Sequence, residues 1–307
     1  MADLTLREPS ERDAAAIAAI CNAVSRELYG IGDADENEVR SWFALPDLKA
    51  WVLERDGRVV AYADTRRDDD GTRFPIDIRV ASEARGSGAA ARLVAAAEDW
   101  ACGRANCGAL LRGFVAERDR QTAAELEHAG YRLIRHSFHM QIELLEHVES
   151  PSWPEGISVR RYSPERDEQG VYECHQDSFA DHWDFHRVPK ELWRTFMLRD
   201  ERFDPDLWWL AEAGGELAAV CLNAWHFSGE PGFGWVGVLG VRPAWRRRGL
   251  GLALLQNSFA DFKERGATKV GLGVDAENTT GAVRLYERAG MRPVRRNDTY
   301  EKPVAAA

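Results

Sequence analysis

The sequence of 307 residues lacks the features that would assign it to a specialised class of protein. Its 26 glycines and 12 prolines are ordinary numbers for a globular chain, so collagen-like and largely disordered chains are excluded. No apolar run approaches the roughly 20 residues of a membrane helix. The N-terminal segment is charged from its third residue and lacks the apolar core of a signal peptide. We therefore expect a soluble, cytoplasmic protein that does not contact membranes.

Cysteine and positive charge are also scarce. The five cysteines are odd in number and scattered along the chain, which favours free thiols in a reducing compartment over a disulfide scaffold. Lys and Arg number 40 against 50 Asp and Glu, which gives a net charge of −10. This acidity argues against a nucleic-acid partner, because binding to a phosphate backbone requires an excess of cationic side chains.

What the chain does contain is a long internal repeat. An apolar run leading into an Arg-Gly-x-Gly turn spans Ile78–Gly88 and recurs 163 residues later at Val241–Gly251. A second match, between Glu125–Tyr131 and Leu285–Met291, has an offset of 160 residues. A period of this length indicates duplication of a whole domain rather than a solenoid. Pro, Ser and Gly concentrate at Glu149–Gly156, and we place the boundary there.

The predicted domains are residues 1–148 and 149–307, and both read as α/β (mixed α+β) domains with one sheet each. In the second, we expect strands and helices in the order Leu207–Ala213 (strand), Glu216–Trp225 (strand), Gly234–Val241 (strand), Gly251–Glu264 (helix), Lys269–Asp275 (strand) and Thr279–Ala289 (helix). In the first, the same order is expected, with Phe74–Ala81 (strand), Gly86–Ala101 (helix), Ala109–Val115 (strand) and a helix that ends at Gly130.

The turn Arg246–Gly251, between a strand and a helix, has the composition of an anion site. Backbone N–H groups at a helix start are unpaired and point the same way, and the helix dipole favours a pyrophosphate there. A nucleoside-triphosphate loop is excluded, since no Lys-Ser/Thr pair follows the glycines. A dinucleotide fingerprint is formally present at Gly86–Ala91 but begins too far beyond its strand. Taken alone, Arg246–Gly251 is as typical of a solvated basic turn.

Further features follow the turn and its helix in the sequence: a second strand, Asn278, and then Leu285-Tyr-Glu before Ala-Gly. This pattern, from about Gly234 to Tyr300, resembles the GNAT superfamily of N-acetyltransferases, and implies two tandem GNAT-type domains, each with a splayed mixed sheet flanked by helices. The resemblance implies that acetyl-CoA is the co-substrate. It also implies that the residues binding the coenzyme are Leu239, Gly240, Val241, Arg246, Arg247, Arg248, Gly249, Leu250, Gly251, Leu252 and Asn278. Asn278 bonds the coenzyme arm or caps the following helix, and both alternatives stay open.

Tyr286 is the predicted catalytic residue, because the family motif has a tyrosine there and a tyrosine hydroxyl can donate a proton to the departing thiolate. The alternative is a core aromatic residue. Many GNAT enzymes carry a Glu on the strand before the loop as the base, but Gly234–Val241 contains neither an acid nor a histidine. Glu230, Asp275 and the polar segment Cys174–His186 are the remaining candidates for the base.

The segment Cys174–His186 corresponds in order to the family's first helices, which bind the acceptor. The predicted substrate-binding residues are Asp181, His182, Trp183 and His186. Two histidines at this spacing are more typical of a surface helical pair than of a binding site. Their spacing would suit zinc, but the glutamate of H-E-x-x-H and a third ligand are missing, so no metal is expected.

We expect only the second domain to be catalytic, because the first lacks the corresponding residues. Its equivalents of Arg246, Asn278 and Tyr286 are Glu83, Arg118 and Leu126, respectively. A tandem pair with its site in the second half resembles the mycothiol synthase family, whose members acetylate the cysteine amine of a sugar-inositol precursor. We expect direct transfer of acetyl from acetyl-CoA to the primary amine of a small molecule, by a monomer or homodimer. A non-catalytic acyl-CoA sensor and a protein N-acetyltransferase are the alternatives.

Overall fold

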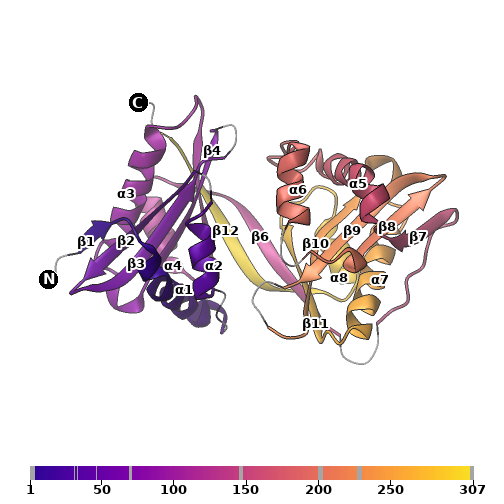
Figure 1. Ribbon diagram of the computed structural model, residues 1–307, viewed down its shortest axis with the longest axis horizontal. Coiled ribbons are helices and arrows are strands. Elements are labelled where there is room, and N and C mark those ends of the chain that lie inside the picture. The colour runs from indigo at the N-terminus through magenta and orange to yellow at the C-terminus, as the bar shows by residue number, and fades with distance from the viewer. Residues whose placement is uncertain are drawn as a thin grey trace. The chain divides into compact units, whose positions relative to one another are not determined.

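A computed structural model describes residues 4–30, 32, 34–45, 47–68, 71–144, 148–199, 203–226 and 230–304. It divides the chain into two compact units, and the expected mixed α/β class with two similar domains is confirmed (Figure 1). Unit 1 comprises Met1–Ser137 and Arg295–Ala307, and unit 2 comprises Phe138–Val294. The predicted domain ranges are contiguous, whereas unit 1 is not, because strands β6 (Arg132–Glu143) and β12 (Arg292–Pro303) each begin in one unit and end in the other.

Unit 1 is a mixed sheet with helices packed against it. Its elements are β1 (Thr5–Arg7), α1 (Ala14–Tyr29), α2 (Glu36–Trp42), β2 (Leu48–Arg55), β3 (Arg58–Arg66), β4 (Arg73–Val80), α3 (Ala89–Cys102), β5 (Leu110–Ala116) and α4 (Arg120–His128). The strands run in the spatial order β1-β2-β3-β4-β5-β12. Helix α3 begins three residues later than the predicted start at Gly86, because Gly86 and Gly88 take positive φ and extend the turn.

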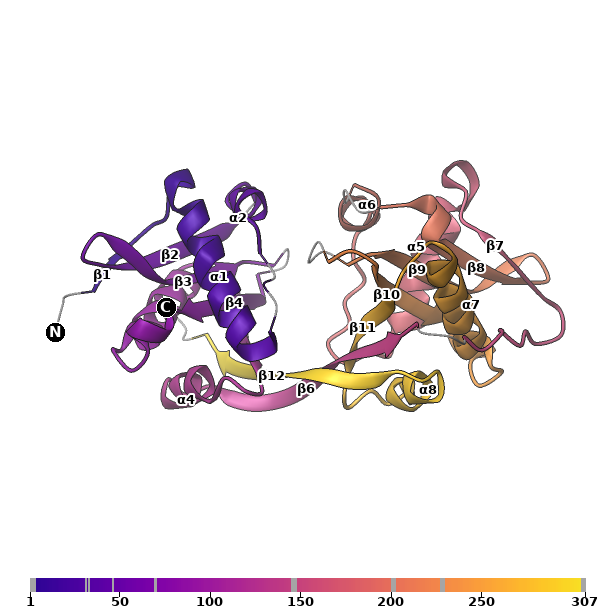
Figure 2. The same cartoon turned by 90° about the horizontal axis from the view of Figure 1, so that it is seen from below.

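Unit 2 repeats this plan. Its elements are β7 (Ile157–Arg161), α5 (Pro164–Phe179), α6 (Lys190–Leu198), β8 (Trp208–Ala213), β9 (Glu216–Trp225), β10 (Phe233–Val241), α7 (Leu250–Glu264), β11 (Lys269–Asp275) and α8 (Ala282–Arg288). The strands run in the order β6-β11-β10-β9-β8-β7. The predicted strands and the long helix are confirmed to within one residue at each end. Figure 2 shows α7 lying against the strands of unit 2. Helix α8 is shorter than the predicted Thr279–Ala289 at its start, because residues 278–281 form a turn.

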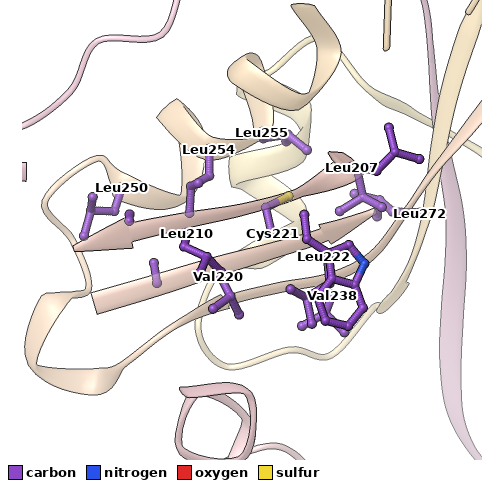
Figure 3. Packing of buried hydrophobic residues seen from close by; sticks show 14 of the residues in the cluster. Leu207, Leu210, Val220, Cys221, Leu222, Val238, Leu250, Leu254, Leu255 and Leu272 are labelled. Carbon is purple, nitrogen blue, oxygen red and sulfur yellow. The ribbon is translucent and has the colours of Figure 1, made fainter. Parts of the chain in front are cut away.

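The core of unit 2 lies on both faces of its sheet. Figure 3 shows Leu254 and Leu255 of α7 on the same side of the sheet as Cys221, with Val220 and Val238 on the other side. Leu254 and Leu255 are fully buried, and each contributes roughly 2 kcal/mol on burial. Helix α7 thereby fixes its own first turn, and with it the preceding loop, against the ends of the central strands. No helix within the described ranges is long and apolar enough to cross a membrane.

Candidate active site

Strands β10 and β11 separate from each other along their length. They are parallel and in register only from Phe233–Lys269 to Trp235–Gly271, although β10 continues to Val241 and β11 to Asp275. The other edge of β10 stays paired with β9 as far as Val241. We call the Trp235–Gly271 pair the apex of this splay, and the ends at Val241 and Asp275 its mouth. The splay leaves the β11-facing edge of β10 without a strand partner.

A bulge in β10 lies two residues beyond the apex. Val236 is registered with Asn223 and Val238 with Leu222, so Gly237 is the extra residue. Bulges of this kind redirect a strand and end its pairing. Gly237 suits the position because a Cβ there would lie 3.2 Å from the Leu222 carbonyl oxygen. The bulge therefore turns β10 away from β11 and opens the splay.

The loop after β10 presents a row of backbone donors. The chain leaves β10 through a short 3-10 helix, Pro243–Trp245, and α7 then starts after Gly249, whose φ of 89° is left-handed. Arg247 also has a positive φ, of 60°. Within the described part of the chain, no hydrogen bond engages the backbone N–H groups from Arg247 to Leu252. Together with the helix dipole these groups form an anion site.

The three arginines of the loop differ in their contacts. Arg246 is engaged within unit 2: its guanidinium donates to Asp181 at 2.9 Å, to the Ser178 carbonyl at 3.0 Å and to the Val241 carbonyl at 3.1 Å. This bond to Arg246 holds the pKa of Asp181 below its usual value. Arg246 and Asp181 therefore tie the end of α5 to the end of β10. The cations that remain exposed on the loop are Arg247 and Arg248, and Arg248 lies 4.7 Å from the Trp245 ring centre.

The splay and the loop line one cleft of about 1160 Å³. The predicted coenzyme-binding residues gather in it, all except Gly240, which is buried against α5, where a Cβ would lie 2.9 Å from Ser178 Cβ. Tyr286 also lines the cleft. A cleft this large accommodates an extended ligand that carries a phosphate at one end.

Tyr286 projects from α8 and is almost buried, with 8% of its surface exposed. Burial raises the pKa of the Tyr286 hydroxyl above its usual value, so it is protonated at neutral pH. Its hydroxyl makes no hydrogen bond to any residue that the structure describes. A protonated phenol on the wall of a cleft is a suitable proton donor for a leaving thiolate.

Asn278 contacts the start of α8, as the capping alternative expects, although the N-cap position itself is Gly281. The Asn278 side-chain oxygen accepts from the backbone N–H of Thr280 at 2.8 Å and from that of Ala282, the first residue of the helix, at 3.5 Å. Asn278 stabilises the turn before the helix and lines the cleft beside Asp275. That Asn278 also binds the coenzyme arm stays a prediction.

The predicted substrate residues separate into two groups. Asp181 and His182 line the cleft near its mouth, and His182 packs its ring 4.4 Å from that of Phe179. Burial is the main cause that lowers the pKa of His182, so its imidazole is neutral near pH 7. Trp183 and His186 are exposed and are not part of the cleft wall.

The candidate bases lie at opposite ends of β11. Asp275, at the mouth, lines the cleft and accepts from the backbone N–H of Glu277 at 3.0 Å. Glu230 precedes β10 and forms an ion pair of 2.5 Å with Lys269. The sequence reasoning missed a third group, a set of rings around Trp235 that includes His139 and His226. His139 lies before residue 149, so the predicted boundary assigned it to the other domain.

Unit 1 has the corresponding turn but hardly any cleft. The hollow beside Arg85 and Gly86 has a volume of about 10 Å³ and is lined by Asp119 and Glu125. Arg85, the one arginine kept in that turn, forms a double ion pair with Glu27 of α1.

Comparison with known proteins identifies the family to which this fold and cleft belong. The model of the acetyltransferase (GNAT) family matches residues 17–131 and again residues 169–291. Mycothiol acetyltransferase from Thermobispora bispora is 35% identical over 220 residues, which cover 67% of this chain and 68% of that protein. Mycothiol acetyltransferase from Actinosynnema mirum is 30% identical over 297 residues, covering 95% and 96%.

Solved structures give the same result. A GCN5-related N-acetyltransferase from Sphaerobacter thermophilus superposes with a TM-score of 0.85 at 32% identity, over 99% of this chain and 97% of that one. A tandem GNAT protein from the clavulanic acid biosynthesis pathway has the same fold, with a TM-score of 0.78 at 19% identity over 99% and 100% of the two chains.

Proposed function

The chain belongs to the acetyltransferase (GNAT) family, and from this premise we propose that unit 2 transfers an acetyl group from acetyl-CoA to the primary amine of a small molecule. One observation carries the proposal: an open cleft joins unengaged backbone donors, a free strand edge and a protonated tyrosine in unit 2. The cytoplasm remains the proposed location.

Each part of the cleft suits one part of the co-substrate. The N–H groups from Arg247 to Leu252 would hold the pyrophosphate, with the Arg247 and Arg248 side chains adding positive charge. The β11-facing edge of β10 from Leu239 to Val241 would hydrogen-bond the pantetheine arm. Bound acetyl-CoA supplies the reactive thioester. Tyr286 would then protonate the sulfur as the carbon–sulfur bond breaks.

The experiment is a calorimetric titration with acetyl-CoA followed by a thiol-release assay over a library of amines, including the acceptor of the mycothiol acetyltransferases. Binding followed by amine-dependent release of coenzyme A supports the proposal. Tight binding without turnover on any amine contradicts it and favours the acyl-CoA sensor, which the lack of an acid on β10 supports. Turnover on peptides but on no small amine would favour a protein N-acetyltransferase.

A further inference from the structure

Four side chains of unit 2 form a group that the proposed reaction has not yet used. We call it the histidine–aromatic cluster: His139 of β6, His226 after β9, and Phe233 and Trp235 of β10. Ring centres lie 4.8 Å apart for His139 and Trp235, 5.0 Å for His226 and Trp235, and 4.1 Å for His226 and Phe233. These distances are those of rings in direct contact.

The cluster lies on the sheet face opposite α7. Gly234 faces α7, since a Cβ there would lie 2.7 Å from the Phe262 ring. Successive side chains of a strand point to opposite faces, so Phe233 and Trp235 point away from α7.

His139 is the member of the cluster that reaches the apex of the splay. Gly271 is the β11 residue registered with Trp235, and a Cβ on Gly271 would lie 2.9 Å from His139 Nε2. The absence of a side chain at Gly271 thus makes room for the imidazole. The backbone of His226 pairs with Phe233, two residues before Trp235, and its ring is stacked on that of Phe233.

The apex is where the acetyl group would be if the proposed function holds. A coenzyme arm that enters at the loop and follows β10 from Val241 reaches the bulge at Gly237 after four residues, or about 13 Å. Gly237 is two residues from Trp235, so the thioester at the end of that arm comes next to the apex.

The candidate bases that line the cleft, Asp275 and His182, lie away from this point. Asp275 is four residues beyond Gly271 on β11, about 13 Å along the strand. His182 is on the wall near Asp275 and Arg246, at the mouth. Next to the cluster, Glu230 and Lys269 pair with each other, and Lys269 lies 4.5 Å from the Phe233 ring.

We propose that His139 is the general base for the acceptor amine, in place of the carboxylate that β10 lacks. Its imidazole takes a proton from the acceptor ammonium, and the freed lone pair forms the new carbon–nitrogen bond to the thioester carbon. The carbon–sulfur bond breaks, and the thiolate takes a proton from Tyr286. The second proton leaving the nitrogen restores Tyr286, and His139 releases its proton to solvent.

The test compares His139→Gln with the wild type on an amine that the wild type acetylates. At pH 7 we expect kcat/KM to fall roughly 100-fold, in the range for a lost general base, with the Kd for acetyl-CoA changed less than about 2-fold. At about pH 9.5, where more of the amine is already neutral, the loss shrinks to roughly 5-fold. A structural role would give the same loss at every pH. His139→Ala, partly rescued by added imidazole, guards against a folding defect in the first variant.

Two further variants make the outcome decisive. His128→Gln changes an exposed histidine in α4 of unit 1 and is expected to leave kcat/KM unchanged. His226→Gln should cost less than His139→Gln and show no selective rescue at high pH. If the wild type turns over an amine while His139→Gln stays within 3-fold of it at pH 7, the base is not His139 but the proposed function stands. If the wild type acetylates no amine, the proposed function fails and this assignment fails with it.

Discussion

Units 1 and 2 share one topology, yet one holds a cleft of about 1160 Å³ and the other a hollow of about 10 Å³. Both have a strand splay, since β4 and β5 are registered only from Arg73–Leu110 to Ile76–Gly113. In unit 1, Leu28 of α1 packs against Ala116 at the end of β5, and its carbonyl oxygen accepts from Arg118. The fold alone therefore does not make the cleft; the residues that fill or vacate the splay do.

The two units also differ in the charge of the residues that line the cleft and the hollow. Asp119 and Glu125 line the hollow of unit 1, where unit 2 has Thr279 and Leu285 at the positions 160 residues later. Two carboxylates there would repel a pyrophosphate. Ser87 N–H in the turn of unit 1 already donates to the Ala84 carbonyl at 3.3 Å, whereas the equivalent Leu250 N–H has no partner in the described residues. Unit 1 therefore has neither the unengaged Leu250-type donor nor the space of the site proposed for unit 2.

The largest expected effect is on catalysis. Tyr286→Phe should lower turnover roughly 10- to 1000-fold with little change in the Kd for acetyl-CoA, because only the proton donor is removed. Tyr131→Phe, which removes a buried hydroxyl from unit 1, is the matched control and should leave turnover unchanged. Steady-state kinetics and calorimetry measure both effects. Equal turnover of Tyr286→Phe and the wild type would remove Tyr286 from the mechanism.

The second expected effect is a difference between the two units in how their stability depends on pH. Burial lowers the pKa of His175 in unit 2 to about 4, and its Nδ1 accepts from the Trp193 indole N–H at 2.9 Å. The contribution of His175 to the free energy of unfolding is complete above pH 6.5, the unfolded pKa, and is lost as pH falls through about 4, at a cost of roughly 3 kcal/mol. His175→Phe should flatten this acid loss in urea unfolding measured against pH.

Unit 1 should respond in the opposite direction. Burial, with help from the facing Asp77, raises the pKa of Asp64 to about 7. The contribution of Asp64 to the free energy of unfolding is complete below its unfolded pKa near 3.8. It is lost as pH rises through about 7. Hydrogen exchange followed between pH 4 and 8 should show opposite trends for β3 and α5. Parallel trends in the two units would contradict both assignments.

The third effect uses two aligned glycines. Gly249 and Gly86 both have positive φ, of 89° and 70°, and a Cβ at either would meet nothing within 4 Å. Valine should destabilise each by about 1–2 kcal/mol through backbone strain. Only Gly249→Val should also weaken acetyl-CoA binding, by roughly 10-fold, because we propose a coenzyme-binding loop in unit 2 alone. Calorimetry measures the loss of binding and thermal unfolding the loss of stability in both variants. Equal losses of acetyl-CoA binding would contradict a coenzyme site in unit 2 alone.

The smallest expected effect concerns charge. Arg248→Ala should weaken acetyl-CoA binding by roughly 3- to 10-fold and reduce its dependence on salt, because the exposed guanidinium adds long-range attraction. The aligned change Arg85→Ala should leave binding unchanged, since Arg85 is already paired with Glu27. Titrations at two ionic strengths measure the difference, which disappears if Arg248 does not face the coenzyme.

Periodicity predicted the strands and the long helix of unit 2 because these elements are set by local patterns, such as the leucines of α7. The splay, the bulge at Gly237 and the ion pair of Arg246 with Asp181 depend on long-range packing and left no such pattern. The exchange of strands β6 and β12 between the units is likewise invisible locally. His139 was missed for this reason, since it precedes the Pro- and Ser-rich segment that marks the apparent boundary.

The Arg246–Gly251 turn was the most informative motif, yet its side chains and backbone have different tasks. The sequence pattern treated three arginines alike, whereas Arg246 is engaged with Asp181 and α5. That distinction required the position of α5, which no spacing in the loop encodes.

The central claim, that only unit 2 has kept a coenzyme site, is tested most directly by the stoichiometry of acetyl-CoA binding. Calorimetry on the wild-type chain should give one site per chain, and Gly249→Val should weaken that site while Gly86→Val leaves it in place. Two sites of similar affinity, or a single site weakened by Gly86→Val and not by Gly249→Val, would contradict the claim.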